Sequence, residues 1–457
     1  MTARSPSYWK AGAECGSRNS AFDKLRRANV GILRNKSLSI SNVMSFFIRN
    51  SSKHKYNLKV TSFTLLVFMT MLLGGITNGE AANWAKLKSL IGPKDSIVVA
   101  DPAGRIIIAK HARQKLVPAS ILKILTSLAA LHYLGSNHRY VTDFFRDPDS
   151  NLVIKGYGDP FMISEVIDGI AQELADLIGD AGMVNDIIVD DSYFNRPLTI
   201  PGISTSTQPY DAPNGALCVN FNTVFFKRTQ SGYASAEVQT PLLPYAIKKI
   251  KLLKPKSGRI VLSHEAKENT IYAGHLFGYF FTRHGVRPRG TVKPGQVDPS
   301  VDKRIYRYVS QFTLYQIIAK LLEHSNNFTT NQLLISCGIQ KSGQPGNLAK
   351  GVAALVDFAA DELQIKDLTI VEGSGISRQN KVSANQMLQV LTKFESHRRL
   401  LPRQGREYYK TGTLHGINTR AGYIAAAADG YYRYVVMINT MGKSTQPVMR
   451  RLLRGLE

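Results

Sequence analysis

The sequence predicts an α+β protein in which a helix-flanked antiparallel sheet domain carries an inserted, mostly β second domain. Strand-like runs stand on both sides of the helical segments: "SIVVADPAGRIIIAKH" (residues 96–111) before them, and "AGYIAAAA" and "YYRYVVMINT" near the C-terminus. A block of short β-like runs, residues 140–305, interrupts the helical part. Strands that are distant in sequence can share one sheet, so the two ends are expected to pair and the middle block to be an insertion.

The elements follow in order. Residues 96–111 contain two β-rich runs around a Pro-Ala-Gly turn, which predicts a hairpin. A helix starts near Pro118, because the N–H that proline lacks would be unpaired in a first helical turn. Within residues 140–305 one helical stretch, "SEVIDGIAQELADLI", breaks up the β-like runs. Then "LYQIIAKLLEHSNNFTTNQLLI" predicts two helices joined at a polar kink over residues 324–327. A further helix, two strands and a last helix from about Thr445 complete the chain.

Residues 1–82 have the layout of an N-terminal extension and signal peptide. A basic head precedes an apolar run over residues 63–73, and the small residues that follow suit cleavage near Ala81. The alternative is a retained anchor, because residues 60–79 carry no charge and are barely long enough to span a bilayer. The short apolar core favours cleavage, and Met44 is a candidate translation start.

The rest of the chain divides into three segments. Residues 83–139 form the first part of the sheet domain, residues 140–305 the inserted domain, and residues 306–457 the second part of the sheet domain. Behind an export signal, this places the protein in the periplasm or the cell envelope.

The composition is that of an ordinary globular protein, with 44% hydrophobic and 20% charged residues. The net charge of +25 raises the question of nucleic-acid binding, but residues 1–60 alone carry twelve Lys/Arg against two Asp/Glu. Because no nucleic-acid module is recognisable, a basic surface facing an anionic cell envelope explains the remaining excess as well. Possible peripheral contact with the membrane or the cell wall follows.

The three cysteines do not require a disulfide. Cys15 lies in the N-terminal extension, whereas Cys218 and Cys337 lie in apolar runs and are expected to be buried free thiols rather than a bridge. No His/Cys pair has ligand spacing, so the sequence predicts no metal site and no cofactor.

The stretch "LVPASILKILTSL" places Ser120 and Lys123 three positions apart on one face of the predicted helix. Its apolar neighbours would partly desolvate the amine, which lowers the lysine pKa and favours the neutral form. A neutral amine beside a hydroxyl is one way to activate a serine nucleophile. The same spacing recurs at Ser7 and Ser52, and alone it more often marks a lysine that snorkels to the surface.

Two further motifs support a catalytic interpretation of Ser120 and Lys123. "HSNNF" contains Ser325 and Asn327 at the interhelical kink, and "KTGT" begins with Lys410 on a predicted strand near the C-terminus. A Ser-x-x-Lys helix start, a Ser-x-Asn kink and a Lys-Thr-Gly strand, in this order, are the signature of active-site serine penicillin-interacting enzymes.

The chain resembles the class C low-molecular-mass penicillin-binding proteins, the D-alanyl-D-alanine carboxypeptidase/endopeptidase family. The resemblance extends from about residue 96 to residue 441. It is carried by "VPASILKILTSLAALHYLG", "GYGDP", "VDDSYF", "QPYDAPNGALCVNFNTV", "SNNF", "VEGSGISRQNKVS" and "KTGTLHGINTRAGYI". It implies a β-lactamase/transpeptidase-like sheet domain, trimming of peptidoglycan stem peptides, and covalent inhibition by β-lactam antibiotics.

The resemblance also implies roles for the matching residues. Ser120 attacks the carbonyl of the penultimate D-alanine, and Lys123 takes its proton. Ser325 and Lys410 relay a proton to the leaving D-alanine, while Asn327 holds the substrate amide. Which lysine is the acylation base is disputed for such enzymes, and Lys123 is favoured here because a buried amine can be neutral.

Binding roles are implied for the last motif. The backbone N–H groups of Ser120 and Thr413 are expected to form the oxyanion hole. The hydroxyls of Thr411 and Thr413, with the Lys410 charge, would hold the terminal carboxylate, although β-propensity alone also explains threonines here. Gly412 would let the substrate backbone lie against the strand.

The family's substrate often carries diaminopimelate, whose D-centre bears an ammonium and a carboxylate. The matching residues here are Asp190 in "VDDSYF" and Arg378 in "GSGISR". Asp190 could instead cap a turn, Asp191 is an equal claimant to the role, and Arg378 could belong to a structural ion pair.

The sequence departs from the family at three places. Asn326 stands where many relatives have aspartate, the insertion is short, and the segment between "GSG" and Lys410 is short and lacks a usual Gly-Thr-Leu stretch. The last two leave endopeptidase activity and substrate docking open.

Two other functions remain as alternatives. A β-lactamase-like hydrolase would need a deacylating carboxylate, and no Glu-x-x-x-Asn element lies between Asn327 and Lys410. A non-catalytic muropeptide-binding protein would not need every catalytic position to be filled, as it is here.

Overall fold

The computed structural model describes residues 83–179, 183–427 and 429–456. The described residues from Leu90 onward belong to one compact unit, and residues 83–89 belong to another and are helical. The predicted export signal and Cys15 lie outside the described residues. No helix in the described ranges is long and apolar enough to cross a membrane.

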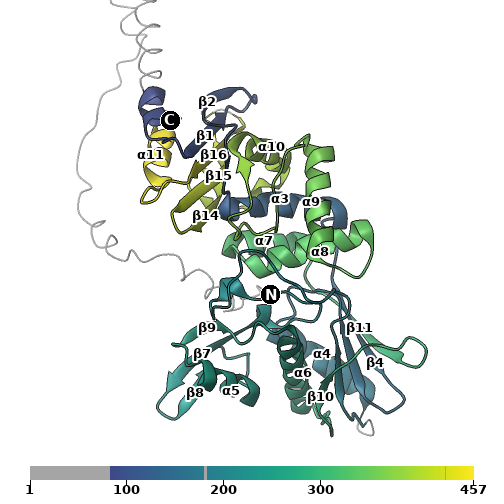
Figure 1. Cartoon of the computed structure of the whole chain (residues 1–457). Coiled ribbons are helices and arrows are strands. Elements are labelled where there is room, and N and C mark those ends of the chain that lie inside the picture. Colours follow the sequence, from purple (N-terminus) through teal and green to yellow (C-terminus); the bar gives the residue numbers. More distant parts are fainter. Residues whose placement is uncertain (1–82, 180–182, 428, 457) are drawn as a thin grey trace, which may run out of the picture. The chain divides into compact units, whose positions relative to one another are not determined.

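A six-stranded antiparallel sheet joins the two ends of the compact unit, as the sequence predicts (Figure 1). Its strands, in spatial order, are β13 (Arg403–Gln404), β14 (Glu407–Leu414), β15 (Ile417–Ala425), β16 (Tyr431–Ile438), β1 (Asp95–Ala100) and β2 (Ile106–Lys110). β1 pairs with β16 over its whole length. Strands about 340 residues apart therefore form the centre of the sheet.

The helices pack on one another around α3 (Lys123–Leu134), whose first eight residues are all buried. A short 3-10 helix (Ala119–Leu122) leads into α3. Around α3 lie α7 (Leu314–His324), α8 (Asn327–Ser342), α9 (Leu348–Leu363) and α10 (Ala384–Phe394). α10 also packs against β16 and β1, so it links the helical layer to the sheet.

Smaller elements complete this part. β3 (Lys115–Leu116) pairs with β12 (Val382–Ser383), a 3-10 helix spans Glu395–Leu400, and α11 (Gln446–Gly455) ends the described chain. The predicted kink between two helices is confirmed, because α7 ends at His324 and α8 begins at Asn327.

The inserted block contains two further sheets. A mixed five-stranded sheet has the order β10 (Val292–Pro294), β6 (Ile187–Asp190), β5 (Leu152–Gly156), β4 (Val141–Arg146) and β11 (Lys303–Val309). An antiparallel three-stranded sheet has the order β8 (Gly232–Ser235), β7 (Thr223–Thr229) and β9 (Gly258–Val261). The two sheets are formed by strands between β4, which begins at Val141, and β11, which ends at Val309.

The block is more helical than its sequence pattern predicts. Besides α4 (Ser164–Ile178), which the pattern predicts, it contains α5 (Pro244–Leu253) and α6 (Ala266–Arg283). α6 is rich in aromatic residues and packs against α4, β6 and β10. Aromatic and β-branched residues favour strands only weakly, and packing against a sheet overrides that preference here.

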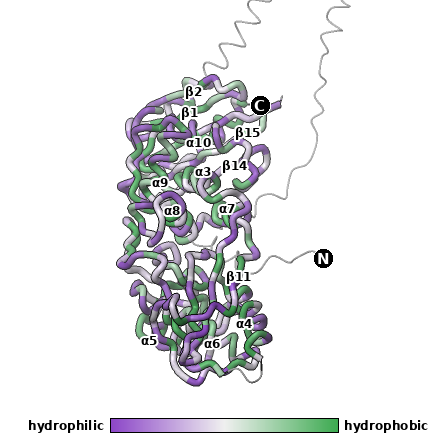
Figure 2. The backbone as a smooth tube through the Cα atoms, turned by 90° about the vertical axis from the view of Figure 1, so that its right-hand side faces the viewer, coloured by the Kyte–Doolittle hydropathy of each residue, from purple (hydrophilic) through white to green (hydrophobic). Residues whose placement is uncertain are grey.

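One hydrophobic core runs through both parts. The same cluster of buried apolar side chains contains Leu125 of α3 and Phe144 of β4. Figure 2 shows hydrophobic residues throughout the unit rather than in one half of it. Because all the described residues from Leu90 on form one compact unit, the division into domains at residues 140 and 305 stays a prediction.

The contact between α8 and α9 depends on glycine. A Cβ at Gly338 would lie 2.4 Å from the backbone nitrogen of Gly351, and one at Gly351 would lie 2.6 Å from the carbonyl oxygen of Leu334. We predict that Gly338→Ala lowers the free energy of unfolding by about 1–3 kcal/mol, because the helices must separate. Urea denaturation measures the change.

Gly169 of α4 is the matched control. It is also a helical glycine, but no atom lies within 4 Å of the position of its Cβ. Gly169→Ala should leave the free energy of unfolding unchanged or raise it by about 0.5–1 kcal/mol. Equal urea midpoints for the two variants would contradict the close packing of α8 and α9.

Candidate active site

Ser120 lies at the start of the short 3-10 helix, where two glycines confine the backbone. Ala119 has φ +49°, a left-handed conformation that residues with a Cβ seldom adopt. A Cβ at Gly375 would lie 1.9 Å from the carbonyl oxygen of Ala119, and one at Gly412 would lie 2.6 Å from the nitrogen of Ser120. Backbone from two distant segments therefore fixes the position of Ser120.

Lys123 follows Ser120 by three residues and is fully buried. Its Nζ lies 2.9 Å from Ser120 Oγ, 2.7 Å from Asn327 Oδ1 and 2.7 Å from the carbonyl oxygen of Ser374. Burial, helped by the nearby positive charge of Lys410, lowers the pKa of Lys123 well below its usual value. A neutral amine can donate to two of these acceptors and accept the hydroxyl proton of Ser120, so the geometry suits a general base.

The kink between α7 and α8 presents the second motif. Ser325 ends α7 with φ +55°, and it lines a cavity of about 550 Å³ together with Ser120 and Asn327. Asn326 caps α8, because its Oδ1 accepts from the backbone N–H of Thr329 at 2.8 Å. An asparagine performs this capping as well as an aspartate, which accounts for the first departure from the family pattern.

Asn327 connects Lys123 to the inserted block. Its Oδ1 accepts from Lys123, and its Nδ2 donates to the carbonyl oxygen of Tyr210 at 3.2 Å. Tyr210 lies in the 3-10 helix Pro209–Asp211 of the insertion. The insertion therefore fixes which way the amide of Asn327 points, and this contact was not predicted from the sequence.

Lys410 lies on β14 and is 4% exposed. Its Nζ donates to the carbonyl oxygen of Thr411 at 2.8 Å. Burial lowers the pKa of Lys410 from its usual value to about 7. Near neutral pH this amine can therefore both hold and release a proton.

The outer edge of β14 faces the cavity. The N–H of Tyr409 donates away from β15, to the carbonyl oxygen of Pro402. Peptide groups alternate along a strand, so the N–H groups of Thr411 and Thr413 point to the same side. No described strand pairs with β14 there beyond Tyr408. The N–H of Thr413, which lines the cavity, is free to join an oxyanion hole.

Gly412 has a different reason to be glycine from the one predicted. Its missing side chain faces the protein itself: a Cβ would lie 2.4 Å from Thr419 Oγ1, 2.6 Å from the nitrogen of Ser120 and 3.0 Å from the Cβ of Ala119. The absence of a side chain lets β14 pack against the short helix that carries Ser120. The prediction that Gly412 also makes room for the substrate backbone stays a prediction.

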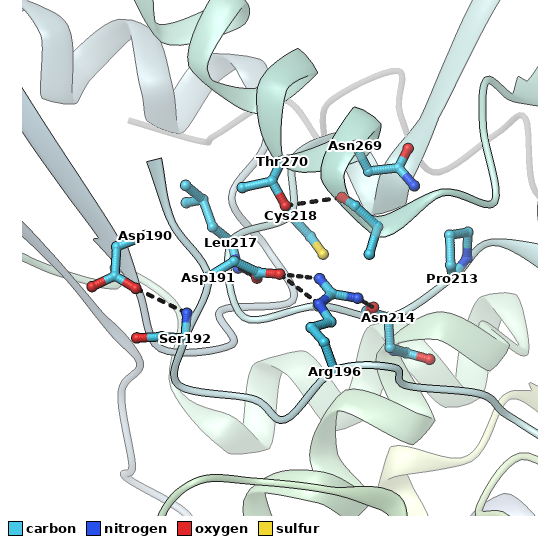
Figure 3. Close-up of polar contacts among 12 residues, drawn as sticks. Asp190, Asp191, Ser192, Arg196, Pro213, Asn214, Leu217, Cys218, Asn269 and Thr270 are labelled. Carbon is cyan, nitrogen blue, oxygen red and sulfur yellow. Dashed lines mark hydrogen bonds and ion pairs between the residues drawn. The ribbon is translucent and has the colours of Figure 1, made fainter. Parts of the chain in front are cut away.

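Asp190 does not line this cavity. Figure 3 shows its carboxylate turned to Ser192, whose backbone N–H donates to it at 2.9 Å. Its other oxygen accepts from the N–H of Val297 at 3.0 Å and lies 3.1 Å from Nζ of Lys155. The side chain is 0% exposed. The carboxylate is buried and already bound by groups of the protein. The predicted contact with a substrate ammonium is therefore at odds with the structure.

Asp191, the other candidate for the contact with the substrate ammonium, is also bound by groups of the protein. Its carboxylate pairs with Arg196 and accepts from the backbone N–H of Leu217 at 2.7 Å (Figure 3). Arg378, in contrast, is exposed and lines the cavity, and its guanidinium donates to the carbonyl oxygen of His415. Of the proposed diaminopimelate pair, only Arg378 can reach a substrate in this cavity.

Two classes of residue were missed by sequence reasoning. Tyr210 and Asp211 enter the cavity from the insertion, and Glu372 lies buried in the loop that follows α9. The motifs "QPYD" and "VEGSG" were visible in the sequence as part of the resemblance, but no spacing rule assigns them a role. In the described ranges no group of three His, Cys, Asp or Glu side chains is placed to hold a metal ion.

The D-Ala-D-Ala carboxypeptidase 3 (S13) family matches residues 85–254 and 252–402, more than half of the chain. The chain belongs to this S13 family.

The S13 match ends at residue 402, before β14. The assignment of Lys410 to the site therefore rests on its motif and on the packing of Gly412 against Ser120. A D-alanyl-D-alanine carboxypeptidase from Actinomadura sp. (strain R39) is 25% identical over 351 residues, which cover 66% of this chain and 65% of the relative. The alignment thus spans about two thirds of each protein.

Solved structures support the fold of this S13 member. Penicillin-binding protein 4 (dacB) from Haemophilus influenzae has a TM-score of 0.67 and 18% identity, over 82% of this chain and 98% of that one. The same protein complexed with a β-lactam has a TM-score of 0.61 and 16% identity, with the same coverage. At this identity the likeness concerns the fold.

We predict that Asp190→Asn acts on stability and not on specificity. The amide would place a donor against two N–H groups and a lysine, so the free energy of unfolding should fall by about 1–3 kcal/mol. The ratio of kcat/KM for a diaminopimelyl-D-Ala-D-Ala peptide to that for an N-acetylated D-Ala-D-Ala peptide should stay within about twofold of the wild-type ratio.

Thermal melting and kinetics with the two peptides test this prediction. Asp176→Asn, at an exposed aspartate on α4 of the same insertion, is the control for an effect of the substitution type. A tenfold loss confined to the diaminopimelyl peptide, with an unchanged melting temperature, would restore the role of Asp190 in substrate binding.

Proposed function

We propose that the chain is an exported serine-type D-alanyl-D-alanine carboxypeptidase that trims peptidoglycan stem peptides through an acyl-enzyme on Ser120. The observation that carries the proposal is the buried Lys123 amine, which lies within 2.9 Å of the Ser120 hydroxyl and is bonded to Asn327. Membership of the S13 family supports the same reaction class. Peptidoglycan stem peptides are the substrates, β-lactams are inhibitors, and the cell envelope is the site of action.

Acylation begins with Ser120. Its Oγ attacks the carbonyl carbon of the penultimate D-alanine while the neutral Lys123 amine takes the hydroxyl proton. The N–H groups of Ser120 and Thr413 stabilise the oxyanion, and the first of them lies in an opening helical turn where donors are free. Ser325 and Lys410 pass a proton to the nitrogen of the leaving D-alanine. Water then hydrolyses the acyl-enzyme.

Asn327 holds the substrate amide, and the terminal carboxylate meets the Lys410 charge and the hydroxyls of Thr411 and Thr413. Arg378 lines the same cavity and is the candidate for a second substrate carboxylate. The membrane or the cell wall would be contacted only peripherally, and nucleic acid is not proposed as a partner.

One acid, Asp211, is among the residues that line the cavity. Its hydrogen bonds disfavour the alternative of a β-lactamase-like hydrolase. Asp211 is 2% exposed and accepts hydrogen bonds from the backbone N–H and hydroxyl of Ser204 and from the hydroxyl of Ser206. A carboxylate that is already satisfied is a poor base for a deacylating water. We therefore expect a penicilloyl enzyme to persist for hours.

We predict that fluorescent penicillin labels wild-type protein on Ser120 and does not label Ser120→Ala. Gel fluorescence followed by peptide mass mapping identifies the labelled residue, and circular dichroism checks the fold. Ser342→Ala, at an exposed serine that ends α8, should be labelled like wild type. Label on another serine, or release of the label within seconds, would refute the assignment or favour the β-lactamase alternative.

A second prediction concerns pH. The pKa of Lys410 is about 7, so its positive charge is present below pH 7 and is lost above it. For a D-Ala-D-Ala peptide with a free carboxylate, kcat/KM should fall about tenfold per pH unit above pH 7. Because Lys410 also passes a proton to the leaving group, kcat for the C-terminal amide should fall with pH as well, but only the peptide with a free carboxylate should show a KM that rises above pH 7. A KM that stays constant with pH for both peptides would mean that Lys410 does not bind the carboxylate.

A further inference from the structure

Glu372 is a buried acid outside the three motifs, in the loop between α9 and β12. Its side chain is 0% exposed, and among the described residues no ion pair joins it to a lysine or arginine. Ionised carboxylates are rarely buried in this way unless other groups satisfy them. The surroundings of Glu372 consist of hydrogen-bond donors.

Six donors surround the carboxylate. They are the backbone N–H groups of Ser374 (2.6 Å), Gly375 (2.8 Å) and Ser377 (3.2 Å), the hydroxyl of Ser374 (2.7 Å), and the side-chain amides of Asn380 (2.5 Å) and Asn331 (3.2 Å). A site built from donors alone matches the ionised form, which only accepts hydrogen bonds. Glu372 therefore puts a negative charge in the interior without a cation in contact.

The loop that this carboxylate shapes touches the catalytic groups at two points. The carbonyl oxygen of Ser374 accepts from Nζ of Lys123 at 2.7 Å. Gly375, with φ +82°, lies directly against the carbonyl of Ala119, the residue before the nucleophile. The carbonyl of Gly373 also accepts from the hydroxyl of Thr126 on α3. A shift of this loop would move an acceptor of the base and the support of Ser120 together.

We propose that Glu372 is a positioning residue for the catalytic base: it fixes the loop that holds Lys123 and supplies a buried negative charge that acts on the Lys123 amine. This rests on the proposed function. The charge acts through space, since the negative field of Glu372 raises the pKa of Lys123 while burial and the Lys410 charge lower it. Without Glu372 the repulsion that Lys410 exerts on Lys123 would lack this compensating charge.

The test is the rate constant of acylation by fluorescent penicillin, measured against pH. In wild type the rate should rise with pH as Lys123 loses its proton, along what we call the acid limb of the profile. Glu372→Gln removes the charge, so this acid limb should move to lower pH. The glutamine amide also points an N–H group at the six surrounding donors, which disturbs the loop that holds Lys123. The maximal rate should therefore fall roughly 10²-fold.

Asn380→Ala is the matched control, because it removes one donor to Glu372 but keeps the charge. It should lower the maximal rate without moving the acid limb. The exchange variant Glu372→Gln/Asn380→Asp returns a carboxylate to the same cage, so its limb should move back toward the wild-type position. This variant also tests the proposal if Glu372→Gln alone does not fold.

Three results would overturn the inference: an acid limb of Glu372→Gln that coincides with wild type, an unchanged rate, or an exchange variant that folds without restoring the limb. Each of these requires that wild type is labelled. If wild type takes no penicillin label at any pH, the proposed function itself fails, so the two failures are distinguishable.

Discussion

The burial of one amine organises this protein. Lys123 lies inside the helical core with its whole side chain excluded from water, and its Nζ meets acceptors from three separate parts of the chain. A buried amine is tolerated only where such partners are supplied. Meeting that requirement brings the start of α3, the kink before α8 and the loop after α9 to one point.

Close packing of the backbone also fixes the position of Ser120. The nucleophile stands on a left-handed residue, Ala119, which is enclosed by Gly375 on one side and Gly412 on the other. Strain of this kind persists only where the surroundings over-determine it. The edge of β14 is thereby held against the helix start, and the N–H groups of Ser120 and Thr413 can face one substrate atom.

Much of this arrangement could be predicted from the sequence. The hairpin, the pairing of the chain ends and the kink follow from local patterns. The convergence of Ser120, Lys123, Ser325 and Asn327 follows from the order of three motifs and the family resemblance, because each motif alone is weak. α5 and α6 were missed because their aromatic and apolar residues do not follow a clear helical period. The prediction for Asp190 was wrong because a sequence motif does not show what its carboxylate contacts. In the structure this carboxylate accepts from the N–H of Val297, which lies in a distant segment.

The link between Asn327 and Tyr210 has a consequence for substitutions in the insertion. The segment around Tyr210 and Asp211 lies in the insertion, yet its carbonyl completes the hydrogen bonding of a catalytic amide. A substitution that shifts the backbone at Tyr210 would therefore turn the amide of Asn327, although Tyr210 is 117 residues away in the chain. The insertion thus contributes to the geometry around Lys123 as well as to the shared hydrophobic core.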